Sequence, residues 1–188
     1  MHNLKSGICH RQIMEEPDSS EAEKIPCVGE IVPAFTLPGP DGEITLESED
    51  ANRITVLTFL QDTIADNALS LVGIVEGIKS NLEKSPIRFI CVLTEPVPTL
   101  DTFREEFEIT VDLASDFDRV TTKEYGLLSE KQGGFTSVPR ESVFVLDGSL
   151  RVAYRWVSET TLDLPIQEEI EAAIKELALS ANQESESV

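Results

Sequence analysis

Cysteine is the residue type in this sequence with the strongest potential for chemistry, because its thiolate is both a nucleophile and a metal ligand. The chain of 188 residues holds Cys9, Cys27 and Cys91, together with His2 and His10. The three cysteines are few and irregularly spaced, which argues against a disulfide scaffold and against a structural zinc site. The residues around Cys9 form a polar N-terminal stretch that predicts at most weak metal binding. We therefore expect no metal and no other cofactor.

Cys91 and Cys27 differ in their sequence surroundings. Cys91 lies in the apolar run Ile87–Leu93, which predicts a buried strand and an unreactive thiol. The alternative is a nucleophile that has moved to Cys91, near a strand end. Cys27 precedes the first predicted hairpin and is expected to be exposed, where it could form a mixed disulfide or pair with Cys9.

The stretch "LTFLQDTIADNALSLVGI", residues 57–74, has the order strand, turn and helix. An apolar run ends at Leu60, the residues 61–67 are mostly polar, and apolar residues then recur with the spacing of one helix face, from Leu69 to Leu82. A nucleophilic cysteine in such a turn would meet the positive end of the helix dipole, but this turn contains none. Asp66 or Asn67 can instead accept hydrogen bonds from the exposed N–H groups of the helix.

The periodicity of the whole chain predicts alternating strands and helices. Strands are predicted at 34–37, 43–46, 54–60, 87–93, 110–116, 141–147 and 150–157, and helices at 69–82, 99–109, 119–126 and 166–177. The second helix would bury Leu100, Phe103 and Phe107, with Thr99 or Asp101 as its cap. Buried strands that alternate with helices imply parallel neighbours, and the late hairpin adds antiparallel strands. The pattern predicts a mixed sheet in a three-layer α/β/α fold of the thioredoxin-like class.

Charge and composition limit the partners. The chain has 35 Asp and Glu against 15 Lys and Arg, a formal net charge of −20. Such a surface repels nucleic-acid phosphates and anionic lipids. No stretch approaches the roughly 20 apolar residues of a membrane helix, and the N-terminus lacks the apolar core of a signal peptide. We expect a cytoplasmic protein, with a hint of adaptation to high salt. Its organisation is predicted as a flexible acidic extension at 1–26, one domain at 27–179 and a disordered tail at 180–188.

Four motifs, in order, resemble the peroxiredoxins, the family that contains the peroxidase component of alkyl hydroperoxide reductase and the thiol-specific antioxidants. They are "VGEIVPAFTLPGPDGEITL", "ITVLTFLQD", "VDLASDFDRVTTKEYGL" and "RESVFVLDGSLRVAYRWV". The resemblance extends from about Val28 to Leu177. It implies a thioredoxin-like fold and a family role in peroxide reduction and antioxidant defence, by attack of a thiolate on the O–O bond.

The resemblance also implies where the catalytic residues should lie. The family pattern Pro–x–x–x–Thr–x–x–Cys places its Pro at Gln61, its Thr at Ala65 and its Cys at Ala68. A shift of one or two residues leaves Asn67 or Asp66, and still no cysteine. Since none of these side chains forms a sulfenic acid, we expect the ordinary peroxidase activity to be absent.

Two further positions follow from the resemblance. Arg140 is the candidate for the family's catalytic arginine, although counting back from Phe144 places that arginine at Glu141. A one-residue bulge would be needed to bring Arg140 to the site. Pro139 corresponds to the cis-proline that faces the active site in thioredoxin-like proteins.

Three functions remain open from the sequence. The first is a redoxin without peroxidase activity that binds a partner or a small ligand in the old pocket. The second is a thiol peroxidase that uses Cys91 or Cys27, with a thioredoxin-type reductant. The third is a non-catalytic regulatory or assembly partner of an active redoxin relative. A homodimer is possible in each case.

Overall fold

The structure, a computed structural model, describes residues 24–48, 53–64, 66–82, 87–129, 138–160 and 163–185. Its strands are β1 (Phe35–Gly39), β2 (Gly42–Leu46), β3 (Ile54–Phe59), β4 (Ile87–Leu93), β5 (Asp112–Ser115), β6 (Leu128–Ser129), β7 (Val138–Pro139), β8 (Ser142–Leu146) and β9 (Val152–Val157). Its helices are α1 (Asp66–Asn81), α2 (Val97–Phe107), α3 (Val120–Glu124) and α4 (Gln167–Ser185). The order agrees with the alternation predicted from sequence.

A five-stranded mixed sheet with the strand order β5-β4-β3-β8-β9 forms the centre of the molecule. Strands β3, β4 and β5 are parallel neighbours, whereas β8 is antiparallel to both β3 and β9. The predicted parallel pairing and the predicted late hairpin are therefore confirmed. Because β3 lies in the middle, its end at Phe59 is flanked on one side by the end of β4 and on the other by the start of β8.

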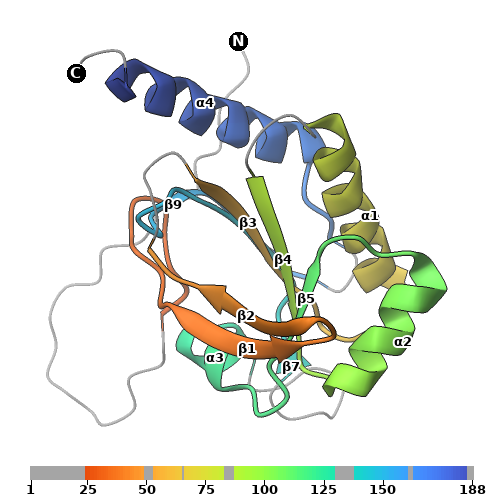
Figure 1. The fold of residues 1–188 in the computed structure, drawn as a ribbon. Coiled ribbons are helices and arrows are strands. Elements are labelled where there is room, and N and C mark those ends of the chain that lie inside the picture. Colours follow the sequence, from red (N-terminus) through yellow and green to blue (C-terminus); the bar gives the residue numbers. More distant parts are fainter. Residues whose placement is uncertain are drawn as a thin grey trace, which may run out of the picture.

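Helices α1 and α4 lie over one face of this sheet and the β1–β2 hairpin over the other (Figure 1), so the sheet is the middle one of three layers. Alternate side chains of β3 belong to different clusters, as the twofold period of a strand requires. Val56 packs in the cluster that holds α1, α4 and part of α2, whereas Leu57 and Phe59 pack in the cluster that holds the β1–β2 hairpin and the segment after α3. Burial on both faces explains why β3 reads as a continuous apolar run.

Helix α2 differs from its prediction at both ends. It starts at Val97, and its cap residue Pro96 makes no side-chain cap hydrogen bond, so neither Thr99 nor Asp101 is the cap. Proline fits the first helical turn because its φ is already helical and it has no N–H to satisfy. Leu100 and Phe103 are buried as predicted, but Phe107 is 44% exposed, so its predicted burial is wrong.

The predicted domain boundaries shift slightly. Pro26 is already buried and Ile25 packs against the β1–β2 cluster, so the packed domain includes residues just before 27. Helix α4 continues to Ser185, beyond the predicted start of a disordered tail at 180. Residues 1–23 of the predicted flexible extension at 1–26 lie outside the described residues.

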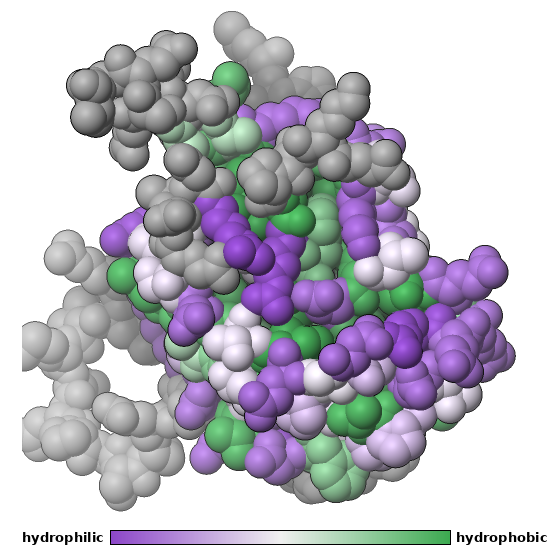
Figure 2. All heavy atoms as spheres, in the orientation of Figure 1, coloured by the Kyte–Doolittle hydropathy of each residue, from purple (hydrophilic) through white to green (hydrophobic). Residues whose placement is uncertain are grey.

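Hydrophilic side chains dominate the face of the molecule drawn in Figure 2, with smaller separate hydrophobic patches between them. This distribution fits a chain whose acidic residues outnumber its basic residues by more than two to one. None of the helices in the described part of the chain combines the length and the apolar character needed to cross a membrane.

Candidate functional site

The turn between β3 and α1 is the place where the sequence predicted a lost active site. Gln61 is half-buried in the loop, and Ala68 is completely buried in the apolar cluster beneath α1. Asn67, the second residue of α1, directs its side chain toward the sheet and not into that cluster. Ala65 and the side chain of Asp66 lie outside the described residues, so the predicted cap at Asp66 stays a prediction. The polar part of the site therefore centres on Asn67.

Glu141 is the partner of Asn67. The Asn67 Nδ2 donates to Glu141 Oε2 at 3.2 Å and lies 3.4 Å from the carbonyl oxygen of Asp163. Glu141 is only 3% exposed, and its second oxygen, Oε1, has no hydrogen-bond partner among the described residues. Burial raises the pKa of the Glu141 carboxyl, the hydrogen bond from Asn67 opposes that shift, and the nearby Asp62 adds to it. A carboxyl group thus occupies the start of α1 at the position that the resemblance assigns to an arginine.

Arg140 does not join Asn67. Its Nε and Nη2 donate to the carbonyl oxygen of Ser158, at 3.2 and 2.7 Å. Successive residues in extended backbone point to opposite faces, and the contacts of Arg140 and Glu141 follow that rule. The register irregularity in β8 lies between Val145 and Leu146, too far along the strand to turn Arg140 toward α1.

A second carboxyl group lies on the other side of the β3 end. Glu95, which follows β4, accepts a hydrogen bond from the Thr63 backbone N–H at its Oε1, at 3.1 Å. Its Oε2 is buried without a partner. Burial raises the pKa of Glu95, the Thr63 bond lowers it, and Asp62 raises it again. Two carboxyl groups of reduced acidity therefore flank the loop that precedes α1.

Cys91 has the surroundings of a core residue. It is fully buried beneath α1 in the middle of β4. Burial raises the pKa of its thiol to about 12, and the negative charges of Glu76 and Asp112 add to the shift. A nucleophilic cysteine needs access and a lowered pKa, and Cys91 has neither.

Cys27 is half-buried and disulfide-bonded, so it carries no free thiol in this structure. The Nη1 of Arg155 lies 3.4 Å from its sulfur. A guanidinium at that distance would stabilise a thiolate if the disulfide were reduced. Cys9, His2 and His10 lie outside the described residues.

Pro139 pairs with Leu128 between β7 and β6, and the peptide bond before it is trans. The predicted cis-proline is therefore wrong. Pro139 sits in a short two-residue pairing next to the site and follows an ordinary extended residue, Val138.

Within the described ranges, no three His, Cys, Asp or Glu side chains converge closely enough to hold a metal ion. The carboxyl groups of Glu95 and Glu141 are separated by the end of β3, which lies between β4 and β8. Two strand spacings amount to about 10 Å, too far for one ion to bridge.

The cytoplasmic location and the high-salt origin stay predictions.

The fold and the position of this site define a peroxiredoxin-type, thioredoxin-like domain, and comparisons with known proteins agree. A crystal structure of a peroxiredoxin-like protein from Aquifex aeolicus superimposes with a TM-score of 0.71 at 20% identity, over 81% of this chain and 88% of that chain. The thiol peroxidase from Chromobacterium violaceum gives a TM-score of 0.70 at 20% identity, with the same coverages. At these identities the structural likeness establishes the fold alone.

The sequence comparison establishes the family. The sequence model described as "AhpC/TSA family" matches residues 28–155. A putative peroxiredoxin, bcp, from Coxiella burnetii (strain RSA 493 / Nine Mile phase I) is 23% identical over 105 residues, which cover 55% of this chain and 69% of the relative. The chain belongs to the AhpC/TSA family, the peroxiredoxin-like redoxins, as its motifs predicted.

The sequence predicted the loop between β3 and α1 correctly, but it did not single out the two carboxyl groups beside that loop. Glu141 was reached only as a position in a count from Phe144, and Glu95 was not singled out at all. A signal was available, because Glu95 directly follows a buried strand that neighbours β3, and polar residues at strand ends in α/β folds gather at one edge. No sequence pattern indicated that Asn67 would pair with Glu141, 74 positions later.

Proposed function

We propose that this chain is a peroxiredoxin-fold protein that has no thiolate chemistry at the family's site and acts by binding a partner or small ligand there. The observation that carries the proposal is the buried carboxyl of Glu141 against Asn67 at the start of α1. The family resemblance implies a cysteine and an arginine at this place. The chain has an amide and an acid instead.

An acid in place of the arginine reverses the charge next to the position of the cysteine. In peroxide reduction a thiolate sulfur attacks one peroxide oxygen, the O–O bond breaks, and the second oxygen leaves as an alkoxide that takes up a proton. A positive neighbour favours the thiolate, whereas a carboxylate raises the pKa of a thiol. The Glu141 carboxyl, with Asp62 nearby, would oppose the reaction even if a cysteine were present. This supports a site that binds without attacking.

A second candidate is a thiol peroxidase that uses Cys27 after its disulfide has been reduced. The observation in its favour is the 3.4 Å approach of Arg155 Nη1 to the Cys27 sulfur. Cys91 lacks a comparable feature, because its thiol is buried and its pKa is raised. Peroxide chemistry at either cysteine would give the protein a peroxide-dependent sulfenic acid, whereas a protein that acts by binding alone forms none.

The test is the intact mass of the reduced, desalted protein before and after one equivalent of hydrogen peroxide, with dimedone present to trap sulfenic acid. We expect no dimedone adduct within minutes, while circular dichroism shows an intact fold. Rapid addition of one dimedone would overturn the proposal. Loss of that adduct in Cys27→Ser, but not in Cys91→Ser, would assign the chemistry to Cys27, and the reverse result would assign it to Cys91.

A further inference from the structure

A groove of about 340 Å³ opens between the loop before α1 and one side of α2. Thr63 and Ile64 form its loop wall. Pro98, Thr102 and Glu106 line it from α2, at a spacing of four residues, which places them along one face of the helix. The groove thus begins beside the candidate site and continues along the helix, and its volume falls in the range of small-molecule and peptide pockets.

The groove exposes large apolar side chains. Ile64 is 88% exposed on the loop wall, and Phe107 is 44% exposed at the far end of α2. The ring of Phe107 packs on that of Phe103, at a centroid distance of 5.3 Å, and Phe103 lies at the base of the groove and belongs to the core. An exposed apolar surface that is continuous with the core and rimmed by polar side chains is typical of an interaction site.

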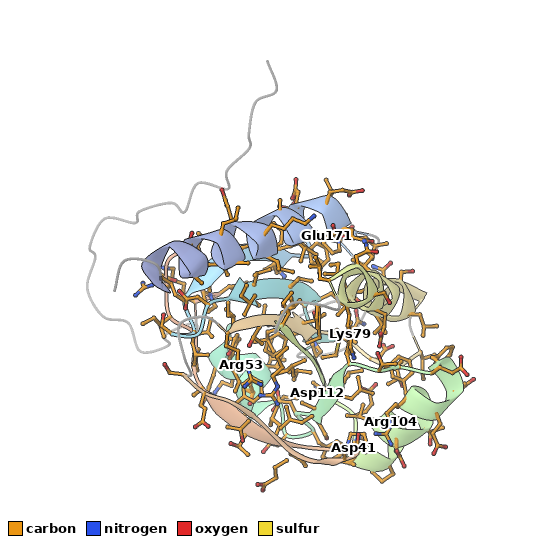
Figure 3. All side chains as sticks on the ribbon, turned by 45° about the horizontal axis from the view of Figure 1, so that its top comes forward. Asp41, Arg53, Lys79, Arg104, Asp112 and Glu171 are labelled. Carbon is orange, nitrogen blue, oxygen red and sulfur yellow. The ribbon has the colours of Figure 1, made fainter. Side chains whose placement is uncertain are left out.

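The charge around the groove is negative. Glu106 lines it, and Glu95 lies next to it through the bond to the Thr63 N–H, with a second carboxyl oxygen that has no partner. Among the described residues that line the groove, none is lysine or arginine. Arg104, the arginine of α2, turns instead to Asp41 at the tip of the β1–β2 hairpin (Figure 3). An apolar floor with acidic ends and no lysine or arginine among its described lining residues complements a basic, amphipathic occupant.

We propose that this groove docks a short amphipathic segment of a partner protein whose apolar side chains alternate with lysine or arginine. The inference deepens the proposed function and rests on it, since this part of the molecule, next to the loop before α1, would then bind a partner and not reduce peroxide. A second copy of this chain is the less favourable occupant, because two molecules with a net charge of −20 each repel one another. From Pro98 to Phe107 the helix rises about 14 Å at 1.5 Å per residue, enough for about two helical turns or four extended residues of the partner.

The experiment uses a labelled amphipathic peptide of leucine and lysine in a helical pattern, and a control peptide in which every lysine is glutamate. Fluorescence anisotropy measures binding to the full chain at low and high salt, and amide chemical shifts locate it. We expect the lysine peptide alone to bind, more weakly at high salt, with shifts concentrated at Thr63, Ile64, Thr102 and Phe107. Shifts spread evenly over the acidic surface, or equal binding of both peptides, would overturn the proposal.

Matched variants separate the groove from general acidity. Ile64→Ser and Phe107→Ser each remove a large apolar side chain from the groove, and we expect each to weaken binding about tenfold, as loss of a central apolar contact does. Leu179→Ser and Glu176→Gln alter similarly exposed residues on α4 and should leave binding unchanged. An equal loss in the α4 variants would show nonspecific attraction and refute the groove.

Sedimentation of the protein alone tests the other occupant. We expect a monomer, and a dimer that Ile64→Ser dissociates would overturn the proposal by assigning the groove to a second copy. The outcome of the peroxide experiment is independent of the outcome of the peptide-binding experiment. A peptide that binds to a protein whose thiol also reacts would sustain the groove and refute the proposed function, whereas an unreactive protein that does not bind would refute only the groove.

Discussion

Two buried carboxyl groups lie at the starts of two helices in this protein, and they are satisfied to very different degrees. Asp116, fully buried after β5, accepts hydrogen bonds from the backbone N–H groups of Thr121 and Thr122 and from the Thr122 hydroxyl, at 2.6–3.1 Å. Glu141 is almost as deeply buried but accepts one hydrogen bond, from Asn67, and leaves Oε1 without a partner.

The two carboxyl groups differ in how far hydrogen bonds offset their loss of hydration. Three donors offset the loss of hydration at Asp116, and they fix the first turn of α3 against the end of the sheet. One amide donor does not do this for Glu141, whose pKa is raised by burial. Natural proteins leave few buried polar atoms unpaired, and such atoms gather where function and not stability decides the residue. This contrast makes Glu141, and not Asp116, the marker of the site.

The largest effect should come from Asp116→Ala. The substitution leaves two N–H groups and one hydroxyl buried without an acceptor, so we expect the free energy of unfolding to fall by about 3 kcal/mol. Urea unfolding followed by circular dichroism measures it. Asp116→Asn keeps one acceptor oxygen and should lose less. If the two variants were equally stable, the hydrogen bonds would not be what distinguishes Asp116 from Glu141.

A thiol placed at the site should report its electrostatics. In Asn67→Cys we expect a thiol pKa above its ordinary value, because Glu141 faces residue 67. Adding Glu141→Gln should lower that pKa by at least about one unit, a tenfold gain in thiolate at neutral pH. The pH dependence of alkylation, followed by intact mass, measures both values.

The matched control for that comparison is Ser70→Cys, one turn further along α1 on an exposed position. Its thiol pKa should not respond to Glu141→Gln. Equal responses at residues 67 and 70 would mean that the substitution acts through the whole helix and not through the contact seen at the site.

The fold was predictable from the sequence because its signals are local and repeated. The apolar run Ile54–Leu60 predicts a buried strand, and Ile87–Leu93 agrees with β4 residue for residue. The errors arose where a tertiary contact replaced a local rule. Proline took the place of a side-chain cap at α2, and α4 continued into a polar sequence that resembles a disordered tail.

For the site, the sequence predicted which of the family's residues are missing, but not which side chains meet in their place. The missing cysteine follows directly from residues 61–68, as does the replacement of the family's proline and threonine. Which residue meets Asn67 depends on the start of β8, where a shift of one position exchanges Glu141 for Arg140 and inverts the charge. A sequence pattern does not fix that register, since both residues precede the strand and only the pairing with β3 and β9 decides it.

A smaller and more specific effect concerns how the stability of the protein depends on pH. Because the pKa of Glu141 is raised above 4.5 in the folded protein, the folded state holds its proton more tightly than the unfolded state. The stability of the protein should therefore fall as the pH rises from 4.5 through the folded pKa. Glu141→Gln removes this penalty and keeps an acceptor for Asn67, so the variant should match the wild type in stability near pH 4 and exceed it above pH 7.

Glu171→Gln on α4 should behave in the opposite way. Hydrogen bonds from Gln167, Asn81 and Lys175 lower the pKa of Glu171 to about 2, so its contribution is present above pH 4.5 and is lost as the pH falls toward 2. The variant should be slightly less stable than the wild type at pH 7, by less than about 1 kcal/mol because the group is near the surface, and equal to it at the lowest pH. Urea titrations of the three proteins from pH 2 to 8 measure both slopes. If Glu141→Gln gains no stability as the pH rises, while the Glu171 slope is intact, then Glu141 Oε1 is hydrated in solution and the contrast with Asp116 does not hold.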